Sequence, residues 1–196
     1  MEYGMNRQRE KLLNALLFFA KNVEYISITK MSKLLFFFES KHFEQTGYPS
    51  IGLRYYAFPQ GPVPKDLWIQ IKDGKIPDDF TGKLQLKPFK VTNAPEKNGH
   101  EFIAHSEPDL TVFSPRELRI LEQQVTQHKH EKADDISEIS HADNGPWDKT
   151  KNEFGLNNEM PYSYSGNEDT PFAKEVLDSL VDEYFETLNE FQINPI

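Results

Sequence analysis

The chain has 196 residues, a formal net charge of −9 and no cysteine, which excludes disulfides, thiol nucleophiles and cysteine-ligated zinc. The acidic balance disfavours a general phosphate-binding surface and therefore a nucleic-acid partner. It fits either a basic protein partner or an ordinary acidic cytoplasmic protein. The N-terminal stretch lacks the pattern of a signal peptide, and no segment reaches the roughly 20 apolar residues of a membrane span. We therefore expect a cytoplasmic protein that does not contact a membrane.

Two helices are predicted in the first 50 residues. Arg7 to Asn22 carries leucines at helical spacing. About Lys30 to Gln45 carries apolar residues on several sides, so this second helix is expected to be central and mostly buried. Thr29 is the predicted N-cap of the second helix, and Gly47 is its predicted left-handed C-cap.

A strand, a turn and a helix start are predicted between residues 53 and 71. Leu53 to Phe58 is rich in aromatic residues and lacks Gly and Pro, which favours a buried strand. Pro59 to Pro64 contains three prolines and a glycine, and we expect this sharp turn to end any strand pairing. Pro64 suits the first turn of a helix that Lys65 to Ile71 continues. Such a constrained stretch fixes the direction of the chain on both of its sides.

The residues that follow predict a β-hairpin. Leu84 to Thr92 and His100 to His105 have strand character. Asn98-Gly99 lies between them and favours a tight turn, because both residue types tolerate positive φ. Together with Leu53 to Phe58, the hairpin can form one small antiparallel sheet, since two isolated strands are only marginally stable.

The C-terminal half is predicted to be helical with one linker. Ser114 opens a helix to about Gln127, with Pro at the first helical position and Glu at the third. Ala133 to His141 is predicted as a short helix with Ile136 and Ile139 facing inward. Residues 152–168 have linker composition, and Thr170 to Asn189 is predicted as a last, amphipathic helix.

These elements predict an α+β fold, namely a mostly helical single domain with a small antiparallel β-sheet and a C-terminal helical appendage. The domain is expected to span residues 1–150, and residues 151–196 are expected to form the linker and the C-terminal amphipathic helix. That last helix either covers the domain's own core or presents apolar residues to a partner or a second copy of the chain.

Two groups of short motifs carry a family resemblance. The first group runs Lys33-Leu34-Leu35-Phe36-Phe37 and then Tyr55 to Pro64, which reads YYAFPQGPVP. The second group runs Ser114-Pro115-Arg116-Glu117, then Ser140-His141, then Pro146-Trp147. In this order the motifs resemble the Panacea (SocA-like) domain over roughly residues 10 to 150. The run Phe36-Phe37-Phe38-Glu39 departs from the family's YFA-D-type pattern.

The resemblance implies an antitoxin-type module that binds and neutralises a protein toxin encoded by a neighbouring gene. It implies a binding protein without cofactor, metal site or catalytic residues. A homodimer is a further candidate assembly. A proteolytic adaptor that delivers the toxin to a protease is the alternative within binding proteins. The alternative from another class is a small hydrolase.

The resemblance also supplies candidate partner-binding or signature residues, which are Arg54, Tyr55, Gly61, Pro62, Val63, Pro64, His141 and Trp147. Two interpretations of His141 and Trp147 are open. In the first, His141 donates a hydrogen bond to a carbonyl and Trp147 fills a core gap. In the second, both residues form the floor of a partner-binding groove beside Gly61 to Pro64. Arg54 either ties its strand to a helix or, less readily, grips an acidic partner.

Catalytic and metal sites find little support in the sequence. Ser140, His141 and Asp143 supply the residue types of a hydrolase triad, but adjacent residues cannot face each other for proton transfer. His128 and His130 form a pair at loop spacing, yet the lysines beside them would repel a cation. We therefore predict no catalytic residue and no metal ligand.

Overall fold

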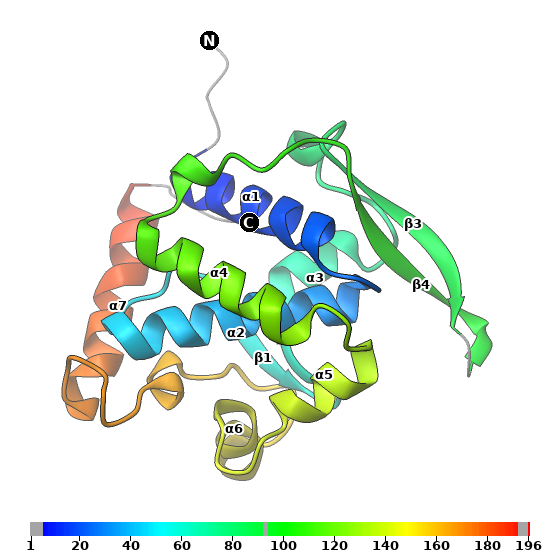
Figure 1. Ribbon diagram of the computed structural model, residues 1–196. Coiled ribbons are helices and arrows are strands. Elements are labelled where there is room, and N and C mark those ends of the chain that lie inside the picture. The colour runs from blue at the N-terminus through cyan, green and yellow to red at the C-terminus, as the bar shows by residue number, and fades with distance from the viewer. Residues whose placement is uncertain (1–5, 92–93, 192–195) are drawn as a thin grey trace.

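The computed structural model describes residues 6–91, 94–191 and 196. Over this part of the chain, seven α-helices and two separate two-stranded antiparallel sheets form a mostly helical α+β fold, which confirms the predicted class. Figure 1 shows helix α2 (Ile28–Thr46) crossing the middle of the molecule, with α4 (Pro115–His128) on one side and strand β1 (Tyr55–Phe58) on the other. The remaining main elements are α1 (Arg7–Asn22), β2 (Gly61–Pro64), α3 (Lys65–Ile71), β3 (Leu84–Val91), β4 (Ala94–Ala104), α5 (Ala133–Ser140), α6 (Pro146–Phe154) and α7 (Lys174–Glu190).

The predicted bounds of α1 and α3 are confirmed, and the start of α2 needs a correction. The N-cap of α2 is Ser27, whose hydroxyl accepts the Lys30 N–H at 3.2 Å. Thr29, the predicted cap, already lies inside the helix, and Ser27 has the extended backbone of a capping residue. Gly47 ends α2 in the left-handed conformation at φ 73°, as predicted.

Helix α2 is central and buried on most sides, as predicted. Its apolar side chains Met31, Leu34, Leu35, Phe38 and Phe43 are at most 1% exposed. The same helix buries three charged side chains, which are discussed with the candidate site.

The largest correction concerns Gly61 to Pro64, which we expected to end strand pairing. The segment is itself strand β2, antiparallel to β1, with Ala57 opposite Pro62. The Ala57 N–H points away from β2 and donates to the Asn158 carbonyl at 2.9 Å. The pair of Ala57 and Pro62 is therefore not hydrogen-bonded, and with a period of two the same holds at Pro64. Both prolines occupy positions where β1 needs no donor, so they are compatible with the strand.

The second hairpin, β3–β4, stands apart from β1 instead of joining it in one sheet. Asn98 and Gly99 pair with Lys90 and Phe89 inside the ladder, so they do not form the predicted turn. The Phe89 ring lies where a Cβ of Gly99 would stand, which covers the glycine and supports an extended backbone there. Figure 1 shows the hairpin extending beyond the helices.

The start of α4 confirms the predicted capping box. The Ser114 hydroxyl accepts the Glu117 N–H, and the Glu117 carboxylate accepts the Ser114 N–H at 2.7 Å. In α5, Ile136 is fully buried but Ile139 is 45% exposed, contrary to prediction. The buried positions of this short helix are Ile136 and Ser140, four residues apart, and Ile139 falls beside that line.

A helix that the sequence analysis did not predict begins at Pro146. Pro146 is the first residue of α6, after Gly145 as the N-cap. Proline is favoured at this position because its missing N–H would have no partner in the first turn. Helix α6 extends into the range predicted as a linker, to Phe154.

The last helix, α7, begins at Lys174 and not at Thr170. The Thr170 hydroxyl instead accepts the Asn167 N–H at 2.9 Å and closes a turn before the helix. Leu177 and Val181 of α7 pack with Phe43 of α2 in a second, smaller apolar cluster. The helix therefore covers part of the domain's own core.

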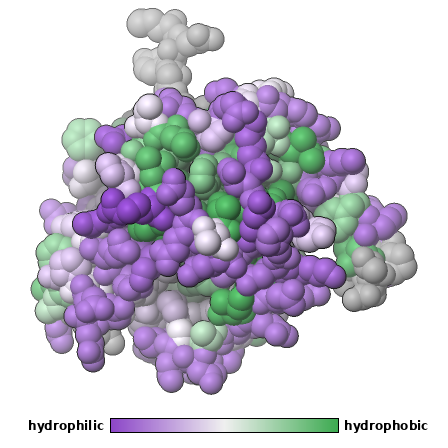
Figure 2. Space-filling view, viewed as in Figure 1, coloured by the Kyte–Doolittle hydropathy of each residue, from purple (hydrophilic) through white to green (hydrophobic). Residues whose placement is uncertain are grey.

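The outer surface in the view of Figure 2 is mostly hydrophilic, with small separated hydrophobic patches. Over the described residues, no helix is both long enough and apolar enough to cross a membrane.

Candidate functional site

Both groups of motifs meet at Gly61, at the start of β2. Gly61 has φ 99°, a conformation that disfavours any side chain. A Cβ on Gly61 would lie 2.5 Å from Ser140 Oγ and 2.9 Å from Lys33 Cε and Nζ. The glycine therefore permits a close approach between the β1–β2 hairpin, α2 and the end of α5.

Lys33 is the unusual group at this junction. Its side chain is fully buried, and its Nζ donates to the Pro62 carbonyl at 2.9 Å. Within residues 6–91, 94–191 and 196, Lys33 has no carboxylate partner. Burial without a counter-charge lowers the pKa of Lys33 to about 7. The amine is therefore close to half protonated near neutral pH.

Lys30, one helical turn earlier, provides a direct comparison. It is also fully buried, but its Nζ donates to three carbonyls, those of Glu24, Lys129 and Glu131. Burial lowers its pKa, while the nearby carboxylates of Glu131, Glu24 and Asp135 oppose that shift. Lys30 therefore connects the start of α2 to the segment between α4 and α5 through hydrogen bonds.

His141 and Trp147 stack on each other behind the hairpin. Their ring centroids are 3.9 Å apart, and the Trp147 Nε1–H donates to the Phe58 carbonyl at 2.9 Å. Trp147 is only 7% exposed. His141 Nε2 is buried and has no hydrogen-bond partner among the described residues, so the expected bond to a carbonyl is absent at this atom. Burial, and then the charges of Lys33 and Lys151, lower the pKa of His141, so the ring is neutral near pH 7.

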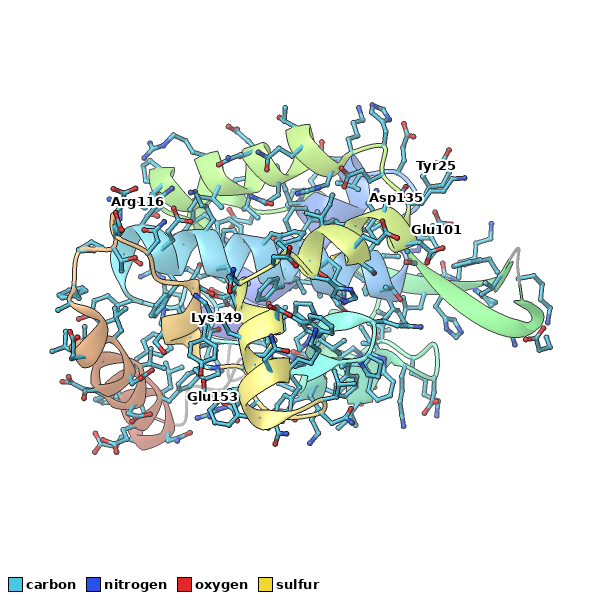
Figure 3. All side chains as sticks on the ribbon, turned by 90° about the horizontal axis from the view of Figure 1, so that it is seen from below. Tyr25, Glu101, Arg116, Asp135, Lys149 and Glu153 are labelled. Carbon is cyan, nitrogen blue, oxygen red and sulfur yellow. The ribbon has the colours of Figure 1, made fainter. Side chains whose placement is uncertain are left out.

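The corner between α5 and α6 is held to the chain that follows it. Figure 3 shows Lys149 and Glu153 on α6. The Tyr164 hydroxyl donates to Glu153, and the Lys149 Nζ lies 5.9 Å from the centre of the Tyr164 ring. These contacts support the helix that carries Trp147.

On its open side the hairpin borders a groove of about 230 Å³, which we call the hairpin groove. Phe58 and Trp68 form an edge-to-face pair along it, with centroids 5.8 Å apart. The other lining residues come from the first two turns of α2 and from β1–β2: Ile28, Thr29, Ser32, Lys33, Pro59, Gln60 and Val63. A mostly apolar groove with a few polar groups is the usual form of a binding site.

The other candidate residues have structural positions. Arg54 is exposed, donates to Glu159 at 2.7 Å, and lies 4.2 Å from the Phe185 ring of α7. Arg54 therefore connects the chain directly before β1 to α7. Tyr55 is 3% exposed and packs edge-to-face on Phe36. Pro62, Val63 and Pro64 are buried along β2, and only Val63 among them also lines the hairpin groove.

Two buried carboxylates fix the loop that leads into β1. Glu39 accepts the backbone N–H groups of Ser50, Ile51 and Gly52 at 2.8–3.0 Å. Burial raises the pKa of Glu39, while these N–H groups favour its charged form. The carboxylate therefore accepts the backbone N–H groups that a neighbouring strand would otherwise accept. In this way it fixes the position at which the hairpin starts.

Glu117 performs a similar task from α4. It accepts hydrogen bonds from Lys11 Nζ at 2.6 Å and from Ser50 Oγ at 2.5 Å. Burial opposes its ionisation, but the bonds from Lys11, Ser50 and the Ser114 N–H hold its pKa at about 2. Glu117 is therefore a permanent anion that joins α1, α4 and the loop before β1.

Two residues of the possible hydrolase triad have other surroundings. Ser140 Oγ donates to the Ser137 carbonyl at 2.6 Å, and Asp143 is exposed. His128 and His130 each pair with a different glutamate, Glu131 and Glu24. Over the described range, no group of three His, Asp or Glu side chains is placed to hold a metal ion.

The sequence analysis did not select Lys33, Phe58 or Trp68 as site residues. The sequence did contain a signal for Lys33. A helix that is apolar on most sides has too little exposed surface for all of its charged residues, so some of them must be buried. Phe58 and Trp68 gave no such signal, since aromatic residues in a strand and a helix are equally expected in a core.

The match to a protein family agrees with this geometry. No curated protein and no solved structure showed a significant match to the chain. The family model described as "Antitoxin SocA-like, Panacea domain" matches residues 31–148. The range begins inside α2 and leaves out α1, so it is shorter than the expected 10 to 150. It includes Lys33, both strands of the hairpin, His141 and Trp147. The chain therefore belongs to the family of SocA-like antitoxins with a Panacea domain.

Proposed function

We propose that the protein is a cytoplasmic antitoxin that neutralises a cognate protein toxin, encoded by a neighbouring gene, through direct binding at the hairpin groove. One observation carries the proposal. The motifs of the family build and brace a single hairpin, and the open side of that hairpin is the groove. The toxin would be occluded or held in an inactive state, without chemistry by this chain.

The distribution of buried and exposed residues around the hairpin supports this function. Gly61, Pro62 and Trp147 are buried and hold the hairpin against α2 and α6. The tip residues Pro59 and Gln60 are exposed at the groove. A rigid support beneath an exposed tip favours recognition, because little conformational entropy is lost when a partner binds.

The test is co-expression of the chain with the product of the neighbouring gene, scored by growth and by co-purification. Trp68→Ala removes one wall of the groove and should abolish or strongly weaken both protection and co-purification. Ile69→Ala is the matched control, since Ile69 is the next residue of α3, is 49% exposed and does not line the groove. Equal binding by both variants would contradict the groove as the contact site. Protection by a variant that no longer binds would point to catalysis or to an indirect effect.

A further inference from the structure

Helix α2 buries two lysines, and only one of them has a hydrogen-bond acceptor for each of its N–H donors. Lys30 donates to three backbone carbonyls, whereas Lys33 donates to one, that of Pro62. A protonated lysine has three N–H donors, so two donors of Lys33 lack an acceptor among the described residues. A buried cation is normally paired, because an isolated charge is costly in an apolar interior. Lys33 also lines the hairpin groove.

The groups around Lys33 do not supply the missing negative charge. The charges of Lys33 and Lys151 both act on His141 at the end of α5, and neither His141 nor Lys151 is an anion. Glu138 is near enough to act on His141, but it is exposed and forms no ion pair with Lys33. The groove therefore borders an amine whose protonated form has no counter-charge among the described residues, in a protein whose net charge is −9.

We propose that the hairpin groove receives a single Asp or Glu side chain of the toxin, and that Lys33 is the counter-charge of its carboxylate. The inference rests on the proposed function and names the chemistry of the contact. The apolar walls, Phe58, Val63 and Trp68, suit the methylene stem of such a side chain.

Size and charge favour one carboxylate over a larger anion. A groove of about 230 Å³ accommodates one side chain and is small for a nucleotide or an extended ligand. A strongly acidic partner would be repelled by the net charge of −9, whereas a local carboxylate on a neutral or basic partner would not. Lys33 has no exposed surface in the free protein, so direct contact with the carboxylate requires the groove to open at Lys33.

Proton uptake on binding distinguishes this role from a structural one. A carboxylate beside Lys33 stabilises the ammonium form, so the complex takes up a proton. At pH 8 the uptake should exceed about half a proton, since Lys33 in the free protein has a pKa of about 7. Titration calorimetry of the neighbouring gene's product, in buffers of different ionisation enthalpy, measures this number.

Lys33→Met keeps the length and apolar character of the side chain and removes the charge. We expect weaker binding by about tenfold or more and the loss of most of the proton uptake. Lys72→Met is the matched control, because Lys72 is exposed and its Nζ lies 5.2 Å from the Trp68 ring at the groove wall. The control should retain both affinity and proton uptake. Unchanged affinity and unchanged proton uptake in Lys33→Met would overturn the inference.

A second pair of variants tests the site without touching Lys33. Thr29→Asp places a carboxylate at the groove, where it competes with that of the toxin, and Thr29→Asn is a neutral control of the same size. Both variants should fold, since an acidic residue in the first turn of α2 is favourable. We expect the Asp variant to bind at least about tenfold more weakly than the Asn variant. Equal affinities would argue against a carboxylate in the groove.

The outcomes separate the two proposals. If the wild-type chain does not bind the neighbouring gene's product, the proposed function fails, and the inference fails with it. If the wild type binds and Trp68→Ala does not, but the Lys33 and Thr29 pairs are without effect, the groove is the contact site and its occupant is not a carboxylate.

Discussion

At the scale of single residues, the position of the Lys33 side chain depends on the absence of a side chain at Gly61. The Lys33 amine reaches the Pro62 carbonyl through the space that a side chain on Gly61 would fill. The sequence pattern showed that Gly61 needs conformational freedom, because glycine between prolines is a turn signal. It could not show the close approach of Lys33 and Ser140, since they come from two other segments of the chain.

Gly61→Ala should destabilise the protein more than strain alone explains. Gly82 is the matched control, because its φ is 80°, close to the 99° of Gly61, and nothing lies within 4 Å of its added Cβ. We expect Gly82→Ala to cost about 1 kcal/mol through backbone strain. Gly61→Ala should cost about 1–3 kcal/mol more, because Ser140 and Lys33 must shift. Denaturant unfolding of both variants measures the difference, and equal costs would remove the packing role of Gly61.

Lys33 should make stability depend on pH. Its pKa is about 7 in the folded protein and 10.5 as a model value for the unfolded chain. Between these values the unfolded chain binds more protons, so stability rises as the pH increases from about 7 to 10.5. A span of about 3.5 pH units corresponds to at most about 5 kcal/mol. Unfolding free energies of the wild type and Lys33→Met, measured from pH 6 to 10, should diverge on lowering the pH, with the variant more stable. Parallel curves would contradict a buried, unpaired Lys33.

At the scale of elements, the sequence predicted those parts whose signals are local. Periodicity located α1 and α3, and the capping box located α4. Strand β2 was missed because prolines were counted against a strand without their register, which depends on the partner strand. The start of α6 was missed for a related reason, since proline can follow one helix or begin the next, and Pro146 begins α6.

Helix α7 should contribute to stability as a part of the core. Leu177 is 2% exposed and belongs to the cluster with Phe43, whereas its neighbour Val176 is 44% exposed. Leu177→Ala should cost about 2–4 kcal/mol, and Val176→Ala should stay within about 0.5 kcal/mol. Thermal or denaturant unfolding compares the two variants. A Leu177→Ala protein as stable as the wild type would mean that α7 is free to serve a partner instead.

At the scale of the whole molecule, one central helix organises both the core and the hairpin. Glu39 of α2 sets the loop before β1, and Glu117 of α4 fixes the same loop from the other side. Lys33 of α2 then holds β2. A chain with many prolines and glycines around its hairpin is thereby kept in one shape, with the hairpin groove on its open side.

Hydrogen exchange of the free chain and of its complex with the neighbouring gene's product tests the central claim most directly. Binding at the hairpin groove should slow exchange in two separate segments, the first turns of α2 from Ile28 to Ser32 and the hairpin tip from Phe58 to Gly61. The exposed face of α7, which carries Glu183 and Glu186, should exchange as in the free chain. Protection confined to α7, with the hairpin groove unchanged, would contradict the account.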